Sequence, residues 1–190
     1  MNLKSLTIAQ ASEHIAAGRA VAFPTSCGYG FALDPFLDSA VALMARLKPE
    51  RSAPVGLIAA DRDQVEPLVD YWTSSGEQYA QLWPAELTLV LAAVPDLPSM
   101  IVSPVGGVAV RVPENPGARE LARHYGGVLT ATSLNRSGQP TAKRPDDLLP
   151  FEHLLAGYIE GETGDEPPST LVDVLTDTAR VLRPGRVVLT

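Results

Sequence analysis

Cysteine and histidine are scarce in this sequence, and their scarcity excludes several kinds of chemistry. The 190 residues contain one cysteine, Cys27, and three histidines. A single cysteine cannot form an intramolecular disulfide, and no paired Cys/His spacing of the zinc-site kind occurs. The chain also lacks a signal-peptide core and an apolar run of about 18 residues. We therefore expect a cytoplasmic protein with no membrane segment.

Positive charge is also in short supply. The chain has 15 Lys plus Arg against 22 Asp plus Glu, a formal net charge of -7. An acidic protein repels polyanions, so a general nucleic-acid-coating role is disfavoured. Hydrophobic residues make up 45% and charged residues 19%, which is typical of a globular protein. The length predicts one domain over residues 1–190.

The familiar catalytic motifs are missing too. The sequence has no G-x-x-x-x-G-K-[ST] phosphate loop and no pattern that requires a Ser-His-Asp triad. His14, His124 and His153 all fall on predicted helices, where a surface or boundary position is the simpler interpretation. Cys27 lies in a loop of small residues, so a nucleophilic role is one interpretation. A lone cysteine with no nearby histidine more often packs as a small hydrophobe.

Apolar periodicity predicts helices that alternate with strands along the whole chain. One helix is expected to begin after Thr7 as its cap and to end at Gly18, and a second to begin with Asp38 as its cap and to end at 47. A third is expected over 116–125, with Asn115 as its cap, and others over 61–72, 75–83 and 146–155. Strands are expected over 20–23, ending at Pro24, and over 55–59, 87–91, 107–112, 128–132, 170–174 and 186–189. Residues 24–30 are predicted to form a loop, and 161–168 a mobile one. The pattern indicates an α/β protein with a mixed sheet.

Cations and hydroxyl groups gather just outside the predicted strand ends, where open α/β sheets bind ligands. The cations are Lys48, Arg51, Arg111 and Arg183, and the polar loop after residue 132 carries Ser133, Asn135 and Ser137. Guanidinium groups match phosphate oxygens, and Ser/Gly-rich turns can aim backbone N–H groups at them. The set suits an anionic ligand such as a triphosphate. From spacing alone, ordinary surface cations and turn residues explain it equally well.

Seven short segments occur in a fixed order. They read FPTSCGYGF (23–31), KPER (48–51), WPAELT (83–88), RVP (111–113), TSLNRSG (132–138), STLVD (169–173) and LRPG (182–185). In this order they resemble P-T-[DE]-T-x-Y-G-L, K-x-R, W-P-G-P-L-T, R-x-P, T-S-A-N-x-S-G, S-T-[VI]-V-D and [IL]-R-x-G. These are the motifs of the TsaC/YrdC family of L-threonylcarbamoyladenylate synthases, and the resemblance covers nearly the whole chain.

The resemblance implies a twisted mixed α/β sheet flanked by helices around a large concave cavity, in a short, single-domain member. It implies a nucleotidyltransferase that forms threonylcarbamoyl-AMP and pyrophosphate from L-threonine, bicarbonate or CO₂, and ATP with Mg²⁺. It makes Lys48 and Arg51 catalytic and assigns them to the nucleotide together with Ser133, Asn135, Ser137 and Arg183. Arg111 would hold a carboxylate or phosphate, and Thr25, Tyr29 and Thr88 would shape the pocket. The product would pass to a TsaD-type transferase that modifies tRNA.

Four departures from the family pattern affect this interpretation. Ser26-Cys27 stands where the family has Asp/Glu-Thr, and a thiol in place of a hydroxyl would weaken a threonine contact by about 1 kcal/mol. Lys48 and Arg51 are separated by two residues instead of one, which turns Arg51 in another direction. Ala85-Glu86 replaces Gly-Pro. Leu134 replaces an alanine, and we expect it to crowd the adenine or ribose.

Two other functions therefore stay open. One is a diverged YrdC-like enzyme that acts on another carbamoyl-adenylate or acceptor. The other is a non-catalytic RNA-binding module, against which the net charge of -7 argues. The sequence also leaves open the oligomeric state, and whether residues 161–168 close over a ligand.

Overall fold

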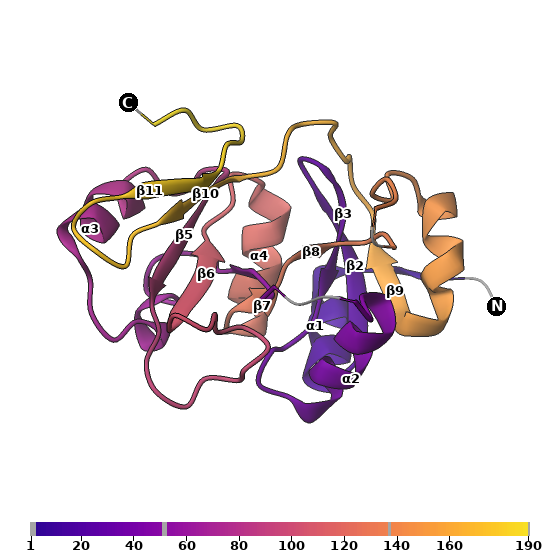
Figure 1. Ribbon diagram of the computed structural model, residues 1–190. Helices are drawn as coiled ribbons and strands as arrows, with labels where there is room; N and C mark the ends of the chain where they lie inside the picture. The colour runs from indigo at the N-terminus through magenta and orange to yellow at the C-terminus, as the bar shows by residue number, and fades with distance from the viewer. Residues whose placement is uncertain (1–2, 51–52, 137, 190) are drawn as a thin grey trace.

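The computed structural model describes residues 3–50, 53–136 and 138–189. Within these residues the strands form two sheets, which lie side by side in Figure 1. The strand orders are β1-β9-β2-β3-β8 and β11-β10-β5-β6-β4-β7. Each sheet contains parallel and antiparallel pairs. The predicted α/β fold with mixed strand directions is confirmed, and the strands are divided between two sheets.

The first sheet is centred on a hairpin of two buried strands. Its strands are β1 (Ser5–Leu6), β2 (Ala20–Thr25), β3 (Gly28–Ala32), β8 (Thr132–Ser133) and β9 (Leu155–Ile159). β2 and β3 pair antiparallel as far as Thr25 opposite Gly28, which leaves a two-residue turn. All five residues of β3 are buried. The hairpin is therefore a rigid wall on which a site can be built.

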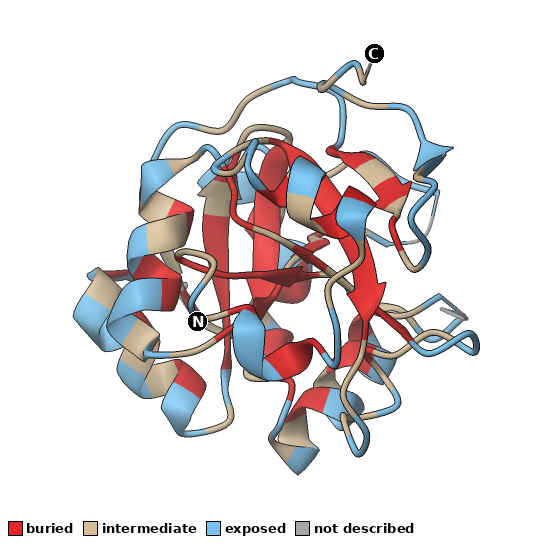
Figure 2. Ribbon diagram, turned by 90° about the vertical axis from the view of Figure 1, so that its left-hand side faces the viewer, coloured by how far each residue is buried: buried red, intermediate tan, exposed pale blue. Residues whose placement is uncertain are grey.

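The second sheet carries the other wall. Its strands are β4 (Leu57–Ile58), β5 (Leu87–Ala92), β6 (Gly107–Arg111), β7 (Leu129–Thr130), β10 (Thr170–Asp173) and β11 (Arg180–Arg183). Every residue of β5 is buried, as expected for a central strand covered on both faces. Figure 2 shows the buried residues concentrated on the strands and on the inner faces of the helices.

The helices cover these sheets, and the four α-helices begin within one residue of the predicted positions. They are α1 (Ile8–Ala16), α2 (Asp38–Leu47), α3 (Ser74–Ala80) and α4 (Pro116–Tyr125), with 3₁₀ turns η1 (Glu66–Leu68) and η2 (Pro145–Leu154). Thr7 and Asn115 cap α1 and α4 through their side chains, as predicted. Asp38 is the first residue of α2 rather than its cap, which is Leu37.

One hydrophobic cluster joins the two sheets beneath α1 and α4. Ile15 of α1 and Leu121 of α4 are fully buried in it. Phe23 of the first sheet belongs to the same cluster, as do Ile58 and Leu129 of the second. Burial of several large apolar side chains at about 1.5–3 kcal/mol each fixes the two sheets relative to each other. A cavity between the sheets therefore has walls that are held in place.

Several predicted elements are wrong. Residues 61–72 contain only the short turn η1, because Pro67 cannot donate the next helical hydrogen bond and clashes with the preceding turn. Residues 186–189 are not a strand, and the last strand is β11 instead. The helix predicted over 146–155 is the 3₁₀ run η2, and β9, which follows it, was missed.

The loop predicted over residues 24–30 is mostly strand, because β2 continues through Pro24. Pro24 lies opposite Tyr29, whose N–H donates to Ala142 and whose carbonyl accepts from Leu134. The pairing of β2 with β9 has already ended at Ala22. Pro24 therefore occupies a position where a missing N–H breaks no ladder hydrogen bond.

The segment 128–132, predicted as one strand, is divided between the two sheets. Leu129 and Thr130 pair with β4 in the second sheet. Thr132 and Ser133 pair with β3 in the first. Ala131, between them, is where the chain crosses from one sheet to the other, and the crossing is visible between β7 and β8 in Figure 1.

Candidate functional site

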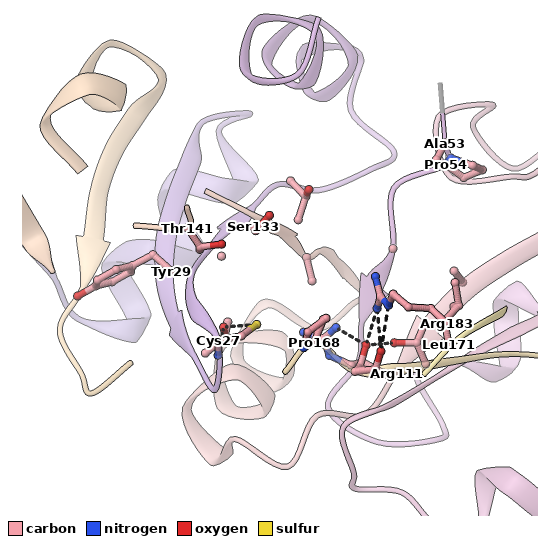
Figure 3. A pocket seen from close by; sticks show the side chains of 18 of the residues that line it. Cys27, Tyr29, Ala53, Pro54, Arg111, Ser133, Thr141, Pro168, Leu171 and Arg183 are labelled. Atoms are coloured by element: carbon pink, nitrogen blue, oxygen red, sulfur yellow. Dashed lines mark hydrogen bonds between the residues drawn. The ribbon is translucent and has the colours of Figure 1, made fainter. Parts of the chain in front are cut away.

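A cavity of about 330 Å³ lies between the two sheets. One wall comes from β2, β3 and β8, the other from β5, β6, β10 and β11 (Figure 3). The polar residues that line it are Thr25, Cys27, Tyr29, Thr88, Arg111, Thr132, Ser133, Thr141, Ser169 and Arg183. Two cations and many hydroxyl groups in one cavity suit a ligand that is anionic and hydrogen-bonding.

Two guanidinium groups meet on one side of the cavity, around the hydroxyl of Ser169. Nη1 of Arg111 lies 3.4 Å and Nη2 of Arg183 lies 3.3 Å from Oγ of Ser169. Arg183 also donates to the Ser169 carbonyl at 2.8 Å. Oγ1 of Thr88 is 2.7 Å from the same hydroxyl. The dashed lines in Figure 3 show these contacts of the two arginines.

The two arginines repel each other. Burial and the charge of Arg111 lower the pKa of Arg183 from its ordinary value, while the nearby Cys27 acts in the opposite direction. Arginine nevertheless stays protonated in proteins. A ligand that brings negative charge between Arg111 and Arg183 would relieve this repulsion.

Among the described residues, Glu86, which directly precedes β5, is the acidic residue that pairs with Arg111. Oε2 of Glu86 lies 3.7 Å from Nε of Arg111, and the Glu86 side chain is only 4% exposed. Nε of Arg111 is buried and has no hydrogen-bond partner in the described part of the chain. The guanidinium group of Arg111 is thus held by charge and by one long hydrogen bond.

A second polar group lies where α2 ends and the chain leaves β8. Nζ of Lys48 donates to Oδ1 of Asn135, which also accepts from Oγ of Ser133 at 2.7 Å. Nδ2 of Asn135 donates to the carbonyl of Gln139 at 2.6 Å. Ser133 lines the cavity. The structure therefore brings Lys48 together with residues 85 or more positions further along the chain.

The turn of the β2–β3 hairpin is closed by Thr25. Its hydroxyl donates to the Gly28 carbonyl at 2.6 Å and accepts from the Cys27 N–H at 3.3 Å. These bonds place Cys27 at the wall of the cavity. The ring of Tyr29 is 1% exposed and stacks edge-on against Tyr158, and burial raises its pKa. Thr25 and Tyr29 thus shape the wall.

The segment 161–168, predicted as a mobile loop, is tied to this hairpin. The N–H groups of Gly164 and Glu166 donate to the carbonyls of Thr25 and Ser26. The Asp165 carboxylate pairs with Lys143. Pro168, at the end of the segment, lines the cavity in Figure 3. The segment crosses from β9 of the first sheet to β10 of the second and forms part of the cavity rim.

The structure gathers most of the predicted site residues around this one cavity. Thr25, Tyr29, Thr88, Arg111, Ser133 and Arg183 line it. Lys48 and Asn135 reach it through Ser133. Arg51 and Ser137 lie outside the described residues. Sequence reasoning missed Ser169 as a site residue, although the motif 169–173 that carries it was the available signal.

Leu134 does not face the cavity, so the expected crowding of a nucleotide by this side chain is wrong. It is fully buried in the main hydrophobic core and its N–H donates to Tyr29. The backbone of Leu134, directly after β8, is fixed by its N–H bond to Tyr29 and by the Ala142 N–H that its carbonyl accepts. Ser133, one residue earlier, is the side chain that faces the cavity.

No group of three or more His, Cys, Asp or Glu residues that could hold a metal ion occurs among the described residues. Mg²⁺ binds readily through nucleotide phosphates and keeps several waters, so a protein can accept it with its nucleotide. In the same described part, no helix is long and apolar enough to cross a membrane.

Comparison with known proteins assigns the family. The Sua5/YciO/YrdC family model, described as "Telomere recombination", matches residues 13–185. The chain belongs to the Sua5/YciO/YrdC family. Two of its relatives are the threonylcarbamoyl-AMP synthases of Stenotrophomonas maltophilia and Vibrio cholerae. They are 36% and 34% identical to it and align over 92% and 93% of this chain and 97% and 96% of their own lengths.

Solved structures of Sua5/YciO/YrdC proteins share the fold. Sua5 of P. abyssi complexed with L-threonine superposes with a TM-score of 0.85 at 29% identity. The match covers 94% of this chain and 54% of that one, so this chain spans about half the length of that protein. YciO of E. coli superposes with a TM-score of 0.82 at 23% identity, over 94% of this chain and 88% of its own. The predicted family and YrdC-like fold are confirmed.

Proposed function

We propose that this chain is an L-threonylcarbamoyl-AMP synthase, a nucleotidyltransferase that uses L-threonine, bicarbonate or CO₂, and MgATP. The observation that carries the proposal is the cavity between the sheets, where Arg111, Arg183 and the Lys48–Asn135–Ser133 chain converge. Synthases at 34–36% identity over nearly the whole chain support it, as does the threonine complex of P. abyssi Sua5.

The reaction needs positioning more than a protein nucleophile. The threonine amine attacks the carbon of CO₂, and one C=O π bond opens onto its oxygen as the N–C bond forms. The nitrogen then passes one proton to solvent or bicarbonate, which leaves a carbamate. A carbamate oxygen then attacks the α-phosphorus of ATP. The bond from the α-phosphorus to the bridging oxygen breaks and pyrophosphate leaves with that oxygen. Neither step oxidises or reduces anything.

The lining of the cavity fits such a reaction. No histidine is among the described residues that line it, so Cys27 has no imidazole base in the cavity. Cations can neutralise charge that develops on phosphate oxygens, and a site that excludes water strengthens this effect. Lys48 and Arg51 would act as the catalytic cations, and Mg²⁺ would arrive on the triphosphate.

The remaining predicted residues take binding roles in this proposal. Ser133, Asn135, Ser137 and Arg183 would hold the nucleotide, and Arg111 a carboxylate or phosphate. Thr25, Tyr29 and Thr88 would shape the pocket for the amino acid and the adenylate. The product is a mixed anhydride, so a transferase of the TsaD type, acting on tRNA in the cytoplasm, would consume it.

The test is pyrophosphate release by the purified protein with ATP, Mg²⁺ and bicarbonate. It is measured with L-threonine, with each other small amino acid and with none, and the adenylate is identified by mass spectrometry. Release confined to threonine, with the mass of threonylcarbamoyl-AMP, is the expected result. No release under any condition would refute the proposal.

A second candidate is a diverged enzyme of the same fold with another acceptor. The observation in its favour is the thiol of Cys27 at the cavity wall, where the family pattern has a threonine. HypF, with a TM-score of 0.80 at 18% identity, shows that the fold occurs in other proteins. Pyrophosphate release that depends on an amine other than threonine would favour this candidate. RNA binding at physiological salt without ATP turnover would favour a non-catalytic module.

A further inference from the structure

Glu86 is a buried acidic residue beside Arg111, one of the two cations that line the cavity, and it does not itself line the cavity. It stands where the pattern that the chain resembles has proline, so that pattern gives it no role. Its backbone carbonyl accepts from the Thr170 N–H at 3.0 Å, which fixes it against β10. Its carboxylate approaches the Nε edge of Arg111 at 3.7 Å. Both side chains are largely buried, with 4% and 15% exposure.

The two edges of the Arg111 guanidinium group face different parts of the structure. The Nε edge faces the carboxylate, whereas Nη1 faces Ser169 in the cavity. Because a guanidinium group is planar, attraction on one edge sets the direction of the other. Glu86 therefore orients the donors that Arg111 presents to a ligand.

Glu86 also changes the charge that a ligand meets. Arg111 and Arg183 both lie within 3.4 Å of the Ser169 hydroxyl, and burying two cations together is costly without a counter-charge. Glu86 supplies that counter-charge from beside the Nε edge of Arg111. When an anion binds to Arg111, Glu86 remains beside it and repels it.

We propose that Glu86 is a positioning and specificity-determining residue, which orients Arg111 and limits the affinity of the cavity for anionic substrates. It acts through Arg111 and need not touch a substrate. This inference rests on the proposed function for the identity of the substrates, L-threonine and MgATP. Its distinctive consequence is that removing the negative charge tightens substrate binding while the reaction slows.

The test is a double-mutant cycle with Glu86→Gln, Arg111→Gln and the double variant. Dissociation constants of L-threonine and of MgATP, each added alone, are measured by calorimetry. With Arg111 present, Glu86→Gln should tighten at least one of them about tenfold, the order expected for a charge several ångströms away at intermediate dielectric. In the Arg111→Gln background the same change should have less than about a twofold effect. In turnover, KM should fall and kcat should fall with it.

Glu114→Gln is the matched control, because Glu114 makes an exposed ion pair with Arg186 at 3.2 Å. It removes the same charge from the chain and should leave both dissociation constants unchanged. If Glu86→Gln does not fold, Glu86→Asp keeps the charge and withdraws it by one methylene group. That variant should bind substrate more tightly than the wild type, by less than the glutamine change would give.

A readout without substrate separates this proposal from the proposed function. The Nε–H signal of Arg111 in ¹H–¹⁵N spectra should shift and exchange faster with water in Glu86→Gln, and not in Glu114→Gln. If the wild type releases no pyrophosphate, the synthase assignment fails and the spectra still test Glu86. An unshifted Arg111 signal would overturn the proposal, as would equal affinity changes with and without Arg111.

Discussion

The hydroxyl of Thr25 offers a direct test of how the hairpin builds the cavity wall. Thr25 is 8% exposed, and its hydroxyl donates to the Gly28 carbonyl at 2.6 Å and accepts from Cys27 at 3.3 Å. Thr25→Val keeps the shape, removes the 3.6 Å contact of the hydroxyl with Sγ of Cys27, and removes both of these hydrogen bonds. Each is worth about 1 kcal/mol, and a buried group left without a partner costs more. We expect a loss of about 2–3 kcal/mol in the free energy of unfolding.

For a chain of this length each kcal/mol lowers the melting temperature by about 2–4 °C, so Thr25→Val should melt about 4–12 °C below the wild type. Thr25→Ser retains the hydroxyl and loses one methyl group, which costs about 1 kcal/mol. Thermal unfolding followed by circular dichroism measures both variants. The loosened turn should also raise KM for threonine in Thr25→Val more than in Thr25→Ser. Equal melting temperatures for the valine and serine variants would refute the reasoning.

Three further changes test other parts of the structure. Lys48→Ala should lower the rate of threonine-dependent pyrophosphate release about a hundredfold with an unchanged circular dichroism spectrum, and unchanged turnover would remove Lys48 from the catalytic role. Gly164→Ala would place a Cβ 2.2 Å from the Ser26 carbonyl oxygen. The free energy of unfolding should fall by about 1–3 kcal/mol and the melting temperature by several degrees. Gly127→Ala is the control, because its Cβ would have nothing nearer than 3.7 Å, and it should melt within about 2 °C of the wild type. Burial lowers the pKa of His14 from 6.5, so as the pH falls the unfolded chain takes up this proton before the folded chain does. The free energy of unfolding contributed by neutral His14 is therefore complete above pH 6.5 and declines as pH falls. In urea titrations, the free energy of unfolding of His14→Gln should decline less steeply than that of the wild type between about pH 7 and 5.

Several residues of the cavity could be predicted from the sequence, but their position around one common cavity could not. Arg111 and Ser133 were predicted because cations and hydroxyls follow strands. That they face one cavity depends on the crossing at Ala131, which puts Thr130 and Thr132 in different sheets. The run 128–132 reads VLTAT and contains no glycine, proline or charged residue, so nothing local marks a division. Only pairing with β3 and β4 decides it.

The pairing of Glu86 with Arg111 is a second contact that the sequence could not predict. Within the motif 83–88, Glu86 is a departure from a family pattern and carries no sign of its partner. Arg111 is 25 residues away, and the contact arises because β5 and β6 are antiparallel neighbours. The single domain over residues 1–190 remains a prediction.

What the sequence by itself determined is the order of the motifs, the family, the α/β class, and the helices that begin at Thr7 and Asn115. The α/β class and these two helices follow from short-range preferences, since caps and apolar periods act within one or two turns. The tertiary structure alone decided the division into two sheets, the continuation of β2 through Pro24 and the burial of Leu134. It also decided the meeting of two arginines at Ser169. Each of these depends on contacts between residues far apart in the chain, and a local pattern carries no information about them.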